Sequence, residues 1–430
     1  MNRRVVITGM GWVTPLGHDI EQVWKRLVKG ESGIAPTTIF DARTYPSQFA
    51  GEVTGFELES FLGPHYERHK TASRNTGFAL AAAEMAWKHA GLDGSGGVDP
   101  ELVGIYLGIG EGPIDFDNFM LAAISGWNPE NRALDAVKWA EVAYERLDVV
   151  REFEQEPNCA AGHLACRFNA PGPNFNTLTA CAASTQAIGE AAALIRRRDA
   201  DLMISGGAHS MIHPLGVTGF NRLTALSTRN DTCVAASRPF DRTRDGFVLG
   251  EGAGILILEE YENARRRGAQ MLAEVVGYGS TADAFRVTDM HEEGRGAIAA
   301  MQAALDDAGV QPEAIDYINA HGTGTEENDK IETRAIHTVF GESAPQIPIS
   351  SVKSMLGHLI AGAGAVELIT CVLAIRDGII PPTINYRHPD PNCDLDYVPN
   401  KPRKARLKFC LSNSFGFGGQ NDALIVKAPE

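Results

Sequence analysis

Short apolar segments with the pattern of buried strands alternate with longer helical segments along almost the whole chain. The expected strands are residues 3–9, 102–107, 202–206, 254–259, 273–277, 317–320, 347–350, 406–413 and 423–427. The expected helices include residues 20–29, 73–90, 182–197, 296–308, 329–340 and 362–376. Such alternation predicts an α/β protein in which helices cover both faces of the sheet.

The size and composition of the chain fit a globular protein with a large core. Of its 430 residues, 44% are hydrophobic and 22% are charged, which is close to the globular average. The net charge of −15 disfavours binding to nucleic acid or to an anionic membrane. No apolar stretch reaches the length of a membrane span, and the first apolar run is expected to be a strand and not a signal peptide.

Cysteine usage indicates a reducing compartment. The seven cysteines are an odd number and include no Cys-x-x-Cys pair. In a chain of this length most of them are expected to be buried thiols. We therefore expect a cytoplasmic protein.

A weak internal repeat suggests two similar halves. A strand, a reactive residue and an alanine-rich helix follow one another at residues 175–197 and again at residues 347–376. The reactive residue is Cys181 in the first copy and Lys353 or His358 in the second. Residues 1–267 and 268–430 are the expected halves, although such similarity also arises by chance in α/β chains.

Residues 113–158 differ from the rest of the chain. They carry ten acidic and four basic residues. Apolar residues recur there at helical spacing, at Leu134, Val137, Ala140, Tyr144, Leu147, Val150 and Phe153. We expect one amphipathic helix laid on the surface and bounded by Pro129 and Pro157. It is either a plain insertion packed on the core, a cap over an entrance, or a dimer contact.

Cys181 lies where a strand pattern gives way abruptly to a helical pattern. A thiol at a helix start meets free backbone N–H groups and the positive end of the helix dipole, which would lower its pKa. Most buried cysteines are only small apolar residues, so a catalytic role requires other groups nearby.

Two later segments supply such groups. His321 ends a strand and is followed by a Gly/Thr loop in which Thr323 and Thr325 place two hydroxyls on one side. Lys353 and His358 flank a turn before a helix that is apolar around most of its circumference. Because that helix is expected to be buried, Glu367 within it needs a partner.

Asp329 and Glu332 are the expected carboxylate partners of Lys353 and of the Gly/Thr loop. A metal site is not expected, because His321 and His358 are far apart in the sequence and lack ligand spacing. The chain also contains neither a P-loop nor a dinucleotide-binding motif, and no cofactor is expected. A final glycine-rich segment, residues 412–421, contains Phe415 and Phe417 and can expose backbone N–H groups.

Taken in order, these segments resemble the decarboxylating β-ketoacyl synthases of the thiolase superfamily, in particular the elongating type II enzymes. The resemblance extends from Arg3 to Ile425 except for much of residues 113–158. It includes residues 225–230, 237–242 and 244–254. It implies a five-layered αβαβα fold built from two similar halves, and a dimer.

The resemblance also implies a reaction. An acyl group held on Cys181 would condense with malonyl-[acyl-carrier-protein], giving β-ketoacyl-[acyl-carrier-protein] and CO₂ without a metal or cofactor. The backbone N–H groups of Cys181 and Phe417 would form the oxyanion hole. Neutral His321 and His358 would donate hydrogen bonds to the enolate oxygen formed by decarboxylation.

Further roles follow from the resemblance alone. Lys353 matches the lysine of the family, held by Glu332. Thr323 and Thr325 match hydroxyls that bind phosphopantetheine, and Phe415 and Phe417 match a mobile gate.

The substrate is less well defined by the sequence. Glu111 stands where the elongating enzymes carry an apolar residue of the acyl pocket, and it indicates either an altered pocket or a loop shifted toward solvent. A carrier protein is acidic like this chain, so a local basic patch is expected to bind it. The candidate patch contains His65, Arg68, His69, Lys70 and Arg74.

Two alternatives stay open at this point. The chain is a ketosynthase of fatty acid or specialised lipid synthesis, or one of a polyketide-type pathway. It acts either as a homodimer or as a subunit of a heterodimeric pair. A catalytically silent subunit is disfavoured because the nucleophile Cys181 is present.

Overall fold

The computed structural model describes residues 3–93 and 98–430. Its main sheet has ten strands in the order β7-β4-β8-β9-β1-β10-β16-β15-β11-β12. The first half of the chain supplies β1 (Val5–Val13), β4 (Val103–Ile109), β7 (Asn174–Thr177), β8 (Leu202–His209) and β9 (Gly252–Glu260). The second half supplies β10 (Ala273–Ala282), β11 (Tyr317–Asn319), β12 (Ile349–Ser350), β15 (Phe409–Gly416) and β16 (Gln420–Lys427).

The two sets of five strands have the same topology. In the first half β4 pairs in parallel with β7 and β8, and β9 pairs antiparallel with β8 and β1. In the second half β11 pairs in parallel with β12 and β15, and β16 pairs antiparallel with β15 and β10. A short antiparallel pairing of β1 with β10 joins them. The five strands of each set therefore have the same order and the same relative directions, and the boundary near residue 267 stays a prediction.

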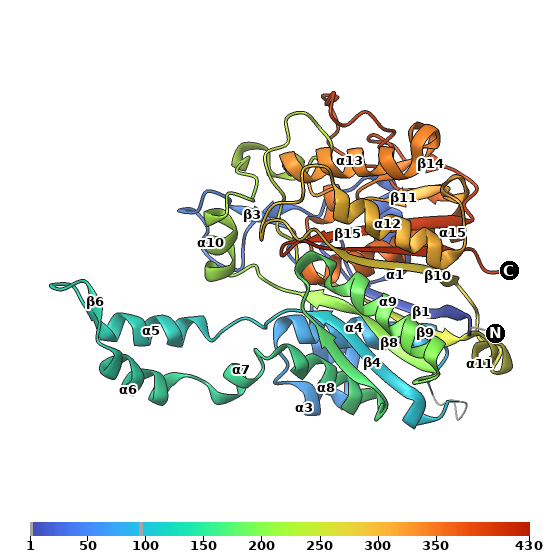
Figure 1. Cartoon of the computed structure of the whole chain (residues 1–430). Coiled ribbons are helices and arrows are strands. Elements are labelled where there is room, and N and C mark those ends of the chain that lie inside the picture. Colours follow the sequence, from blue (N-terminus) through green and yellow to red (C-terminus); the bar gives the residue numbers. More distant parts are fainter. Residues whose placement is uncertain (1–2, 94–97) are drawn as a thin grey trace.

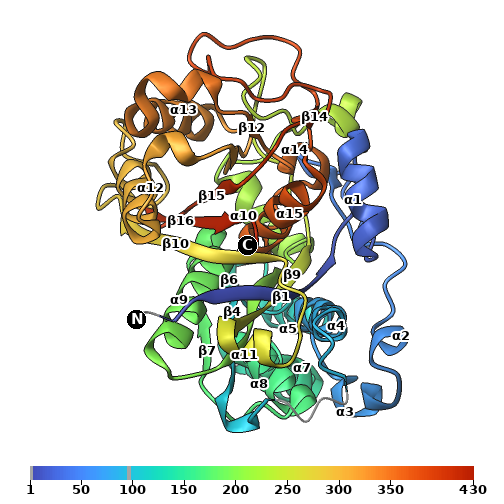
Figure 2. The same cartoon turned by 90° about the vertical axis from the view of Figure 1, so that its right-hand side faces the viewer.

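Helices pack on both sides of each set of strands. The helices of this framework are α4 (Arg74–His89), α8 (Pro157–Phe168), α9 (Ala183–Arg197), α12 (Arg295–Ala308), α13 (Glu326–Phe340) and α15 (Ala363–Asp377). The central helices α9 and α15 contact strands of both halves, whereas α4 and α8 pack on the first half and α12 on the second. Figures 1 and 2 show α12 and α13 on one outer side and α4 and α8 on the other. The predicted αβαβα layering is confirmed.

Glycine and alanine allow these layers to approach closely. A Cβ atom added to Gly9 or Gly11 of β1 would lie 2.1 or 2.2 Å from backbone oxygens of α4. These oxygens belong to Ala82 and Ala86, which are completely buried. The alanine-rich helix pattern and the glycine-rich strand therefore form one tightly packed layer boundary.

The expected elements are observed with small shifts at their ends. Helix α1 spans Ile20–Lys29 as predicted, while α13 begins a few residues earlier than expected, at Glu326. Smaller elements are β2 (Ala35–Pro36), β3 (Phe49–Ala50), α2 (Leu58–Leu62), α3 (Tyr66–His69), α10 (Pro214–Arg222), α11 (Tyr261–Arg266), α14 (Lys353–Leu356), β13 (Ile379–Ile380) and β14 (Arg403–Lys404). None of the helices in the described ranges is long and apolar enough to cross a membrane.

Residues 116–153, the greater part of residues 113–158, form a projecting arm, which corrects the prediction of one helix laid on the surface. The arm consists of α5 (Phe116–Gly126), β5 (Trp127–Asn128), β6 (Ala133–Leu134), α6 (Ala136–Arg146) and α7 (Val149–Phe153). Figure 1 shows α5, β6 and α6 extending away from the body. Pro129 lies in the turn between β5 and β6, whereas Pro157 does mark a boundary, as the first residue of α8.

The apolar stripe expected to face the core points largely outward. Val137, Tyr144 and Phe153 are 69%, 96% and 64% exposed. The reason is that α5 and α6 pack against each other, with the ring of Phe119 against that of Trp139. Helical periodicity thus located the helical stretch but not the surface that it contacts.

Candidate active site

Cys181 lies on a 3₁₀ turn, Ala180–Ala182, that leads directly into α9. Ala180 has a φ of 47°, an unusual left-handed conformation for alanine, and it turns the chain sharply before the thiol. The side chain of Cys181 is 5% exposed. The strand-to-helix turn predicted from the sequence is therefore present.

Backbone N–H groups surround the sulfur of Cys181. Its own N–H and that of Phe417 lie within hydrogen-bonding reach of the thiol. The end of β15 packs closely here, since a Cβ added to Gly416 would lie 3.4 Å from the nitrogen of Cys181. Two N–H groups at the nucleophile are the arrangement that an oxyanion hole requires.

Burial raises the pKa of Cys181 to about 11, which corrects the expectation of a lowered value. The positive charge of Lys353 and the N–H of Phe417 act in the opposite direction but are outweighed. Burial destabilises the thiolate by more than the helix N-terminus stabilises it. The side chain of Cys181 is therefore a neutral thiol at pH 7.

His358 follows α14 and is 2% exposed. Its Nδ1 accepts a hydrogen bond of 3.2 Å from the N–H of Ile360. In the neutral ring the proton must then sit on Nε2, and this atom has no partner among the described residues. Burial and the charge of Lys353 lower the pKa of His358 well below its usual value, so the ring is neutral.

His321 follows β11 and has the same tautomer for a different reason. Its Nδ1 lies 3.4 Å from Nζ of Lys353, and an ammonium group can only donate a hydrogen bond. The proton of the neutral ring is therefore on Nε2. Burial, Lys353 and His358 lower the pKa of His321 well below its usual value.

The fold brings Cys181, His321 and His358 together. One potential ligand atom of each lies within 4.8 Å of the others. The argument against a metal site from sequence spacing therefore fails, because three possible ligands do converge. The nearby ammonium of Lys353 still disfavours a cation at this position by charge repulsion.

The partner of Lys353 is Glu367, which corrects the predicted pairing with Glu332. Both side chains are 2% exposed, and Nζ of Lys353 is hydrogen-bonded to Oε1 of Glu367. Glu367 thus has the partner that its position on an apolar helix demanded. A buried pair of this kind fixes the ammonium next to His321.

Glu332 and Asp329 instead hold the Gly/Thr loop. Glu332 accepts hydrogen bonds of 2.8 Å from the N–H groups of His321 and Gly322. Asp329 accepts from the N–H groups of Gly324 and Phe240. Burial raises the pKa of Glu332 to about 7 and also raises that of Asp329. Asp329 and Glu332 were expected to pair with both Lys353 and the Gly/Thr loop, and these contacts agree with the loop pairing.

A cavity of about 480 Å³ opens beside the nucleophile. It is lined by Cys181, His321, His358, Thr323, Thr325, Phe415 and Phe417, among others. The hydroxyls of Thr323 and Thr325 lie 3.0 Å apart. The residues predicted for catalysis, gating and phosphopantetheine binding therefore share one cavity, except for Lys353, which is buried behind His321.

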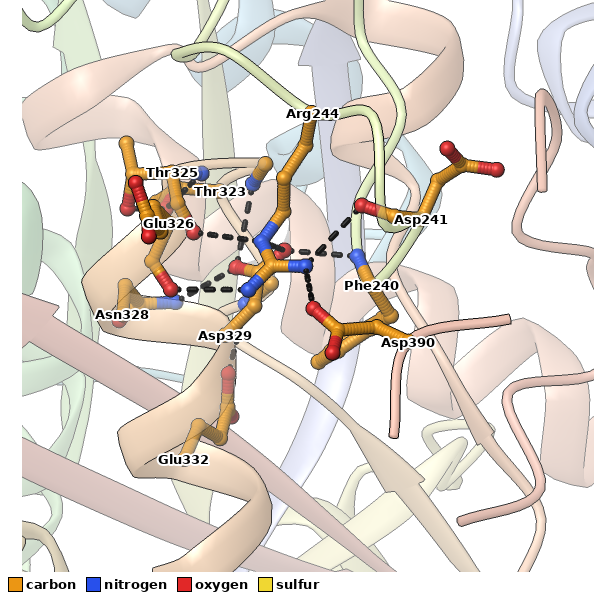
Figure 3. Close-up of polar contacts among 12 residues, drawn as sticks. Phe240, Asp241, Arg244, Thr323, Thr325, Glu326, Asn328, Asp329, Glu332 and Asp390 are labelled. Atoms are coloured by element: carbon orange, nitrogen blue, oxygen red, sulfur yellow. Dashed lines mark hydrogen bonds and ion pairs between the residues drawn. The ribbon is translucent and has the colours of Figure 1, made fainter. Parts of the chain in front are cut away.

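Arg244 is a site residue that the sequence reasoning did not single out. Its guanidinium group donates to the backbone oxygens of Thr325 and Glu326 and to the carboxylate of Asp390 (Figure 3). Nε of Arg244 also lies 3.6 Å from Oδ2 of Asp329. Arg244 thereby fixes the threonine loop at the wall of the cavity. Its only sequence signal was its place in the family-like segment 244–254.

Phe415 and Phe417 lie at the β15–β16 hairpin. Phe415 is buried and its ring lies 5.7 Å from that of His321. Gly418 and Gly419, which follow Phe417, have left-handed φ values of 90° and 73°. This glycine turn gives the hairpin its tight reversal next to Cys181, and movement of the two rings stays a prediction.

Glu111 is exposed and does not line the cavity beside Cys181. Asn75 holds the loop by donating to the backbone oxygens of Gly110 and Glu111. A carboxylate in solvent is the arrangement expected from a shifted loop. An effect of Glu111 on chain length stays a prediction.

The predicted basic patch is divided by the fold. His65, Arg68 and Lys70 are exposed, and Lys70 pairs with Glu67. His69 is buried against His163. Arg74 is hydrogen-bonded to the fully buried Glu251. Arg74 is therefore a structural residue and not a free cation for docking.

The contacts of Arg74 and His69 show which part of the patch stays available. Only Arg68 and Lys70 present an exposed permanent positive charge in this segment.

The chemical centre at Cys181 combines three kinds of group. They are a neutral thiol, two neutral imidazoles with free Nε2–H groups, and paired backbone N–H groups. Such a centre can hold an acyl group on sulfur and stabilise an enolate and an oxyanion.

Sequence comparisons agree with this geometry. Residues 2–264 match the family described as Beta-ketoacyl synthase, N-terminal domain, and residues 272–387 match Beta-ketoacyl synthase, C-terminal domain. A protein of Coxiella burnetii named 3-oxoacyl-[acyl-carrier-protein] synthase 2 is 41% identical over 99% of this chain and 98% of its own length. A protein of the same name from Synechocystis is 43% identical with the same coverage of both chains.

Solved structures show the same fold. A type II polyketide ketosynthase, solved with its acyl-carrier protein, is 34% identical with a TM-score of 0.88 and full coverage of both chains. A β-ketoacyl synthase from Burkholderia phymatum is 32% identical with a TM-score of 0.86 and the same coverage. From these matches and the site geometry, the chain belongs to the β-ketoacyl synthase family, whose members are acyltransferases of the condensing type.

Proposed function

We propose that this enzyme condenses an acyl group on Cys181 with malonyl-[acyl-carrier-protein], releasing CO₂ and β-ketoacyl-[acyl-carrier-protein] in fatty acid or specialised lipid synthesis. The observation that carries the proposal is the meeting of the Cys181 thiol with two imidazoles whose Nδ1 atoms are both engaged as acceptors. Relatives named 3-oxoacyl-[acyl-carrier-protein] synthase 2 support it.

The first half-reaction is a thioester exchange. The sulfur of Cys181 attacks the acyl thioester of the carrier, a C–S bond to the carrier breaks, and the Cys181 proton ends on the released carrier thiol. The oxyanion formed on the way accepts hydrogen bonds from the N–H groups of Cys181 and Phe417. Thr323 and Thr325 bind the phosphopantetheine arm in the cavity.

The second half-reaction joins the two acyl units. The malonyl group loses CO₂, and the electron pair of the broken C–C bond forms an enolate whose oxygen accepts hydrogen bonds from Nε2–H of His321 and His358. The enolate carbon attacks the Cys181 thioester and the C–S bond breaks. The departing thiolate takes a proton from water, which its pKa of about 11 favours. Lys353, held by Glu367, fixes the tautomer of His321.

Mass spectrometry of the intact protein tests this function. Incubation with a panel of acyl-carriers is expected to add an acyl group to wild-type protein, mapped to Cys181, and none to Cys181→Ala. Added malonyl-carrier is expected to remove the adduct. Protein that stays unmodified with every carrier in the panel would contradict the proposal.

A polyketide-type ketosynthase is the second candidate. The structure of the ishigamide ketosynthase/chain length factor is 36% identical to this chain, with a TM-score of 0.88 and full coverage. The same panel separates the candidates, because a polyketide enzyme is expected to accept its own β-keto product for further extension.

We propose a homodimer in which the arm of residues 116–153 packs on the second subunit. The arm exposes Ile124, Trp127, Val137, Tyr144, Val149 and Phe153. The edge strand β7 also exposes Phe175 at 47%. Apolar surface of this extent is typical of subunit interfaces. Light scattering is expected to give a dimer for the full chain, and a heterodimeric enzyme would instead require a second gene product for activity.

For carrier docking we propose Arg68 and Lys70. The double charge reversal Arg68→Glu/Lys70→Glu is expected to raise the apparent KM for acyl-carrier with little change in kcat, because only encounter and docking are weakened. Reversal of exposed Lys401 in another part of the surface is the matched control. An unchanged KM in the double variant would remove the docking role.

We also propose that the reaction takes place in the cytoplasm. All seven cysteines, including the buried Cys371 and Cys410, are free thiols in the structure. Free thiols in this number fit a reducing compartment. Localisation of a tagged, active protein in fractionated cells tests this placement, and recovery outside the cytoplasm would contradict it.

A further inference from the structure

His209 is a buried histidine that the proposed reaction does not use. It is the last residue of β8 and is 6% exposed. Neither Nδ1 nor Nε2 has a hydrogen-bond partner among the described residues. By contrast, the neighbouring Ser210 donates to the buried Glu251 at 2.7 Å. Burying two unpaired polar atoms is costly, so a group that pairs with them would be bound favourably.

The position of His209 relates it to the acyl group on Cys181. A Cβ atom added to Gly110 would lie 3.3 Å from the ring of His209 and 3.4 Å from Leu178, three residues before the nucleophile. His209 is also close enough to His358 to affect its pKa. It therefore lies near the catalytic centre, beside the loop that contains Gly110.

The chain beyond His209 enters an apolar cluster around the nucleophile. Ile212 packs in one cluster with Cys181, Leu226 and Phe247, and Met211 packs against that cluster. Because Cys181 belongs to this cluster, an acyl chain on its sulfur would begin among these apolar side chains. His209 is thus a polar group at the margin of apolar surroundings, which is how ligand sites usually gain orientation and specificity.

Two more unpaired polar atoms lie on the segment that leads to the nucleophile. They are Oγ1 of Thr179, which is buried, and Oδ1 of Asn176 at the end of β7. Burial, together with a smaller effect of the nearby His213, lowers the pKa of His209 to about 3. The ring is therefore neutral and offers one N–H donor and one nitrogen acceptor.

We propose that His209 is a specificity residue that hydrogen-bonds an oxygen on the acyl chain carried by Cys181, so that the preferred acyl donors bear a hydroxyl or keto group. This inference rests on the proposed function, because it needs an acyl group on Cys181. A saturated chain leaves both nitrogens of His209 unpaired, and an oxygenated chain satisfies one of them. The substrate class is therefore an oxygen-bearing acyl-[acyl-carrier-protein].

The test compares matched acyl-carriers with the full-length protein. The rate constant for acylation of Cys181 is measured by intact mass for hexanoyl-, 3-hydroxyhexanoyl- and 5-oxohexanoyl-carriers. Wild-type protein is expected to react with at least one oxygenated donor about tenfold faster than with hexanoyl-carrier, the size of one hydrogen bond to a buried partner.

Two variants at His209 separate hydrogen bonding from packing. His209→Leu is expected to lose the preference and to accept hexanoyl-carrier at least as well as wild type does. His209→Gln, which keeps a donor and an acceptor, is expected to retain part of the preference. The control is His18→Leu, the same change at a partly buried histidine held between Phe56 and Phe61, and it should leave the ratio unchanged.

The outcomes distinguish this inference from the function on which it rests. Equal or faster acylation by hexanoyl-carrier in wild type, or an unchanged ratio in His209→Leu, would overturn the role of His209 while leaving condensation intact. Absence of acylation by every donor would overturn the proposed function and this inference with it. The wild-type comparison decides the question even where a variant does not fold.

Discussion

The two halves of the molecule contain the same strand-to-helix turn with different chemistry. In the first half the turn Ala180–Ala182 leads into α9, and in the second half the turn Ile360–Gly362 leads into α15. Ala180 and Ile360 have nearly equal left-handed φ values of 47° and 45°. The two turns pack against each other, so the repeat places equivalent backbone on both sides of one centre.

The difference between the turns lies in what each carries. The middle residue is the nucleophile Cys181 in one and Ala361 in the other. Only Leu178 and Thr179 separate β7 from its turn, whereas residues 351–359 separate β12 from its turn and contain Lys353 and His358. One copy therefore supplies the nucleophile, and the other supplies the groups that act on it. A duplicated backbone with divided roles explains why both halves are needed for one site.

The largest expected effect is loss of the nucleophile from the first turn. Cys181→Ala is expected to abolish condensation, by more than about a thousandfold, because no acyl-enzyme can form. Product formation from acyl- and malonyl-carriers is measured by mass spectrometry. Condensation at a rate near that of wild type would mean that the two turns do not differ in the way described.

Removing either histidine is expected to separate the half-reactions. His358→Ala and His321→Ala should lower condensation by about 10²–10³-fold, because a hydrogen bond to the enolate oxygen is lost. Acylation of Cys181 should persist in both variants. Stopped-flow release of CO₂ and intact-mass measurement of the adduct monitor the two steps. Equal loss of both steps would assign the histidines to the nucleophile instead.

The buried ion pair distinguishes the second turn energetically. Glu367→Leu alone is expected to destabilise the fold by about 3–5 kcal/mol, since it leaves the buried charge of Lys353 without an opposite charge beside it. Denaturant unfolding measures the change in free energy. The double variant Lys353→Met/Glu367→Leu is the control and should recover much of the stability. Equal losses in the single and double variants would contradict the pairing.

The raised pKa of Cys181 is testable by alkylation. Because burial raises this pKa to about 11, the reactive thiolate is a minor species at pH 7. The rate of iodoacetamide modification at Cys181 should rise about tenfold per pH unit between pH 7 and 9. Peptide mass spectrometry resolves this site from the exposed Cys166. A rate that levels off below pH 8 would instead support the lowered pKa expected at a helix start.

The smallest effect on condensation is expected at Ala361, the residue of the second turn that is equivalent to Cys181. Ala361→Ser adds a hydroxyl at a completely buried site that carries no chemistry in this account. Stability should fall by about 1–3 kcal/mol because of the added polar group, while condensation by the folded protein should change by no more than a few-fold. A loss comparable to that of Cys181→Ala would show that the turns share the catalytic role.

The sequence was most informative about regular elements and about residues next to element ends. Alternating apolar segments located the main strands and helices, because burial on a sheet or a helix face leaves a short-range pattern. Cys181, His321 and His358 were each found at the end of a strand or the start of a helix, where side chains of adjacent strands converge. Their convergence in the structure follows from the repeated topology.

Long-range pairings could not be obtained in the same way. Glu332 and Glu367 are both acidic residues on buried helices, and only the packing of α13 and α15 decides which of them reaches Lys353. The arm has the periodicity of a surface helix, yet its helices pack on each other and leave the apolar stripe outside. The pKa of Cys181 depended on the amount of burial, which a local motif does not report.

A single-turnover experiment tests the central claim most directly. Protein carrying an acyl group on Cys181 is mixed with malonyl-carrier, and the adduct, CO₂ and 3-oxoacyl-carrier are measured together. The account predicts that loss of the adduct from Cys181 equals the CO₂ and the 3-oxoacyl-carrier formed, one for one. Product formation while the adduct stays on Cys181 would contradict it.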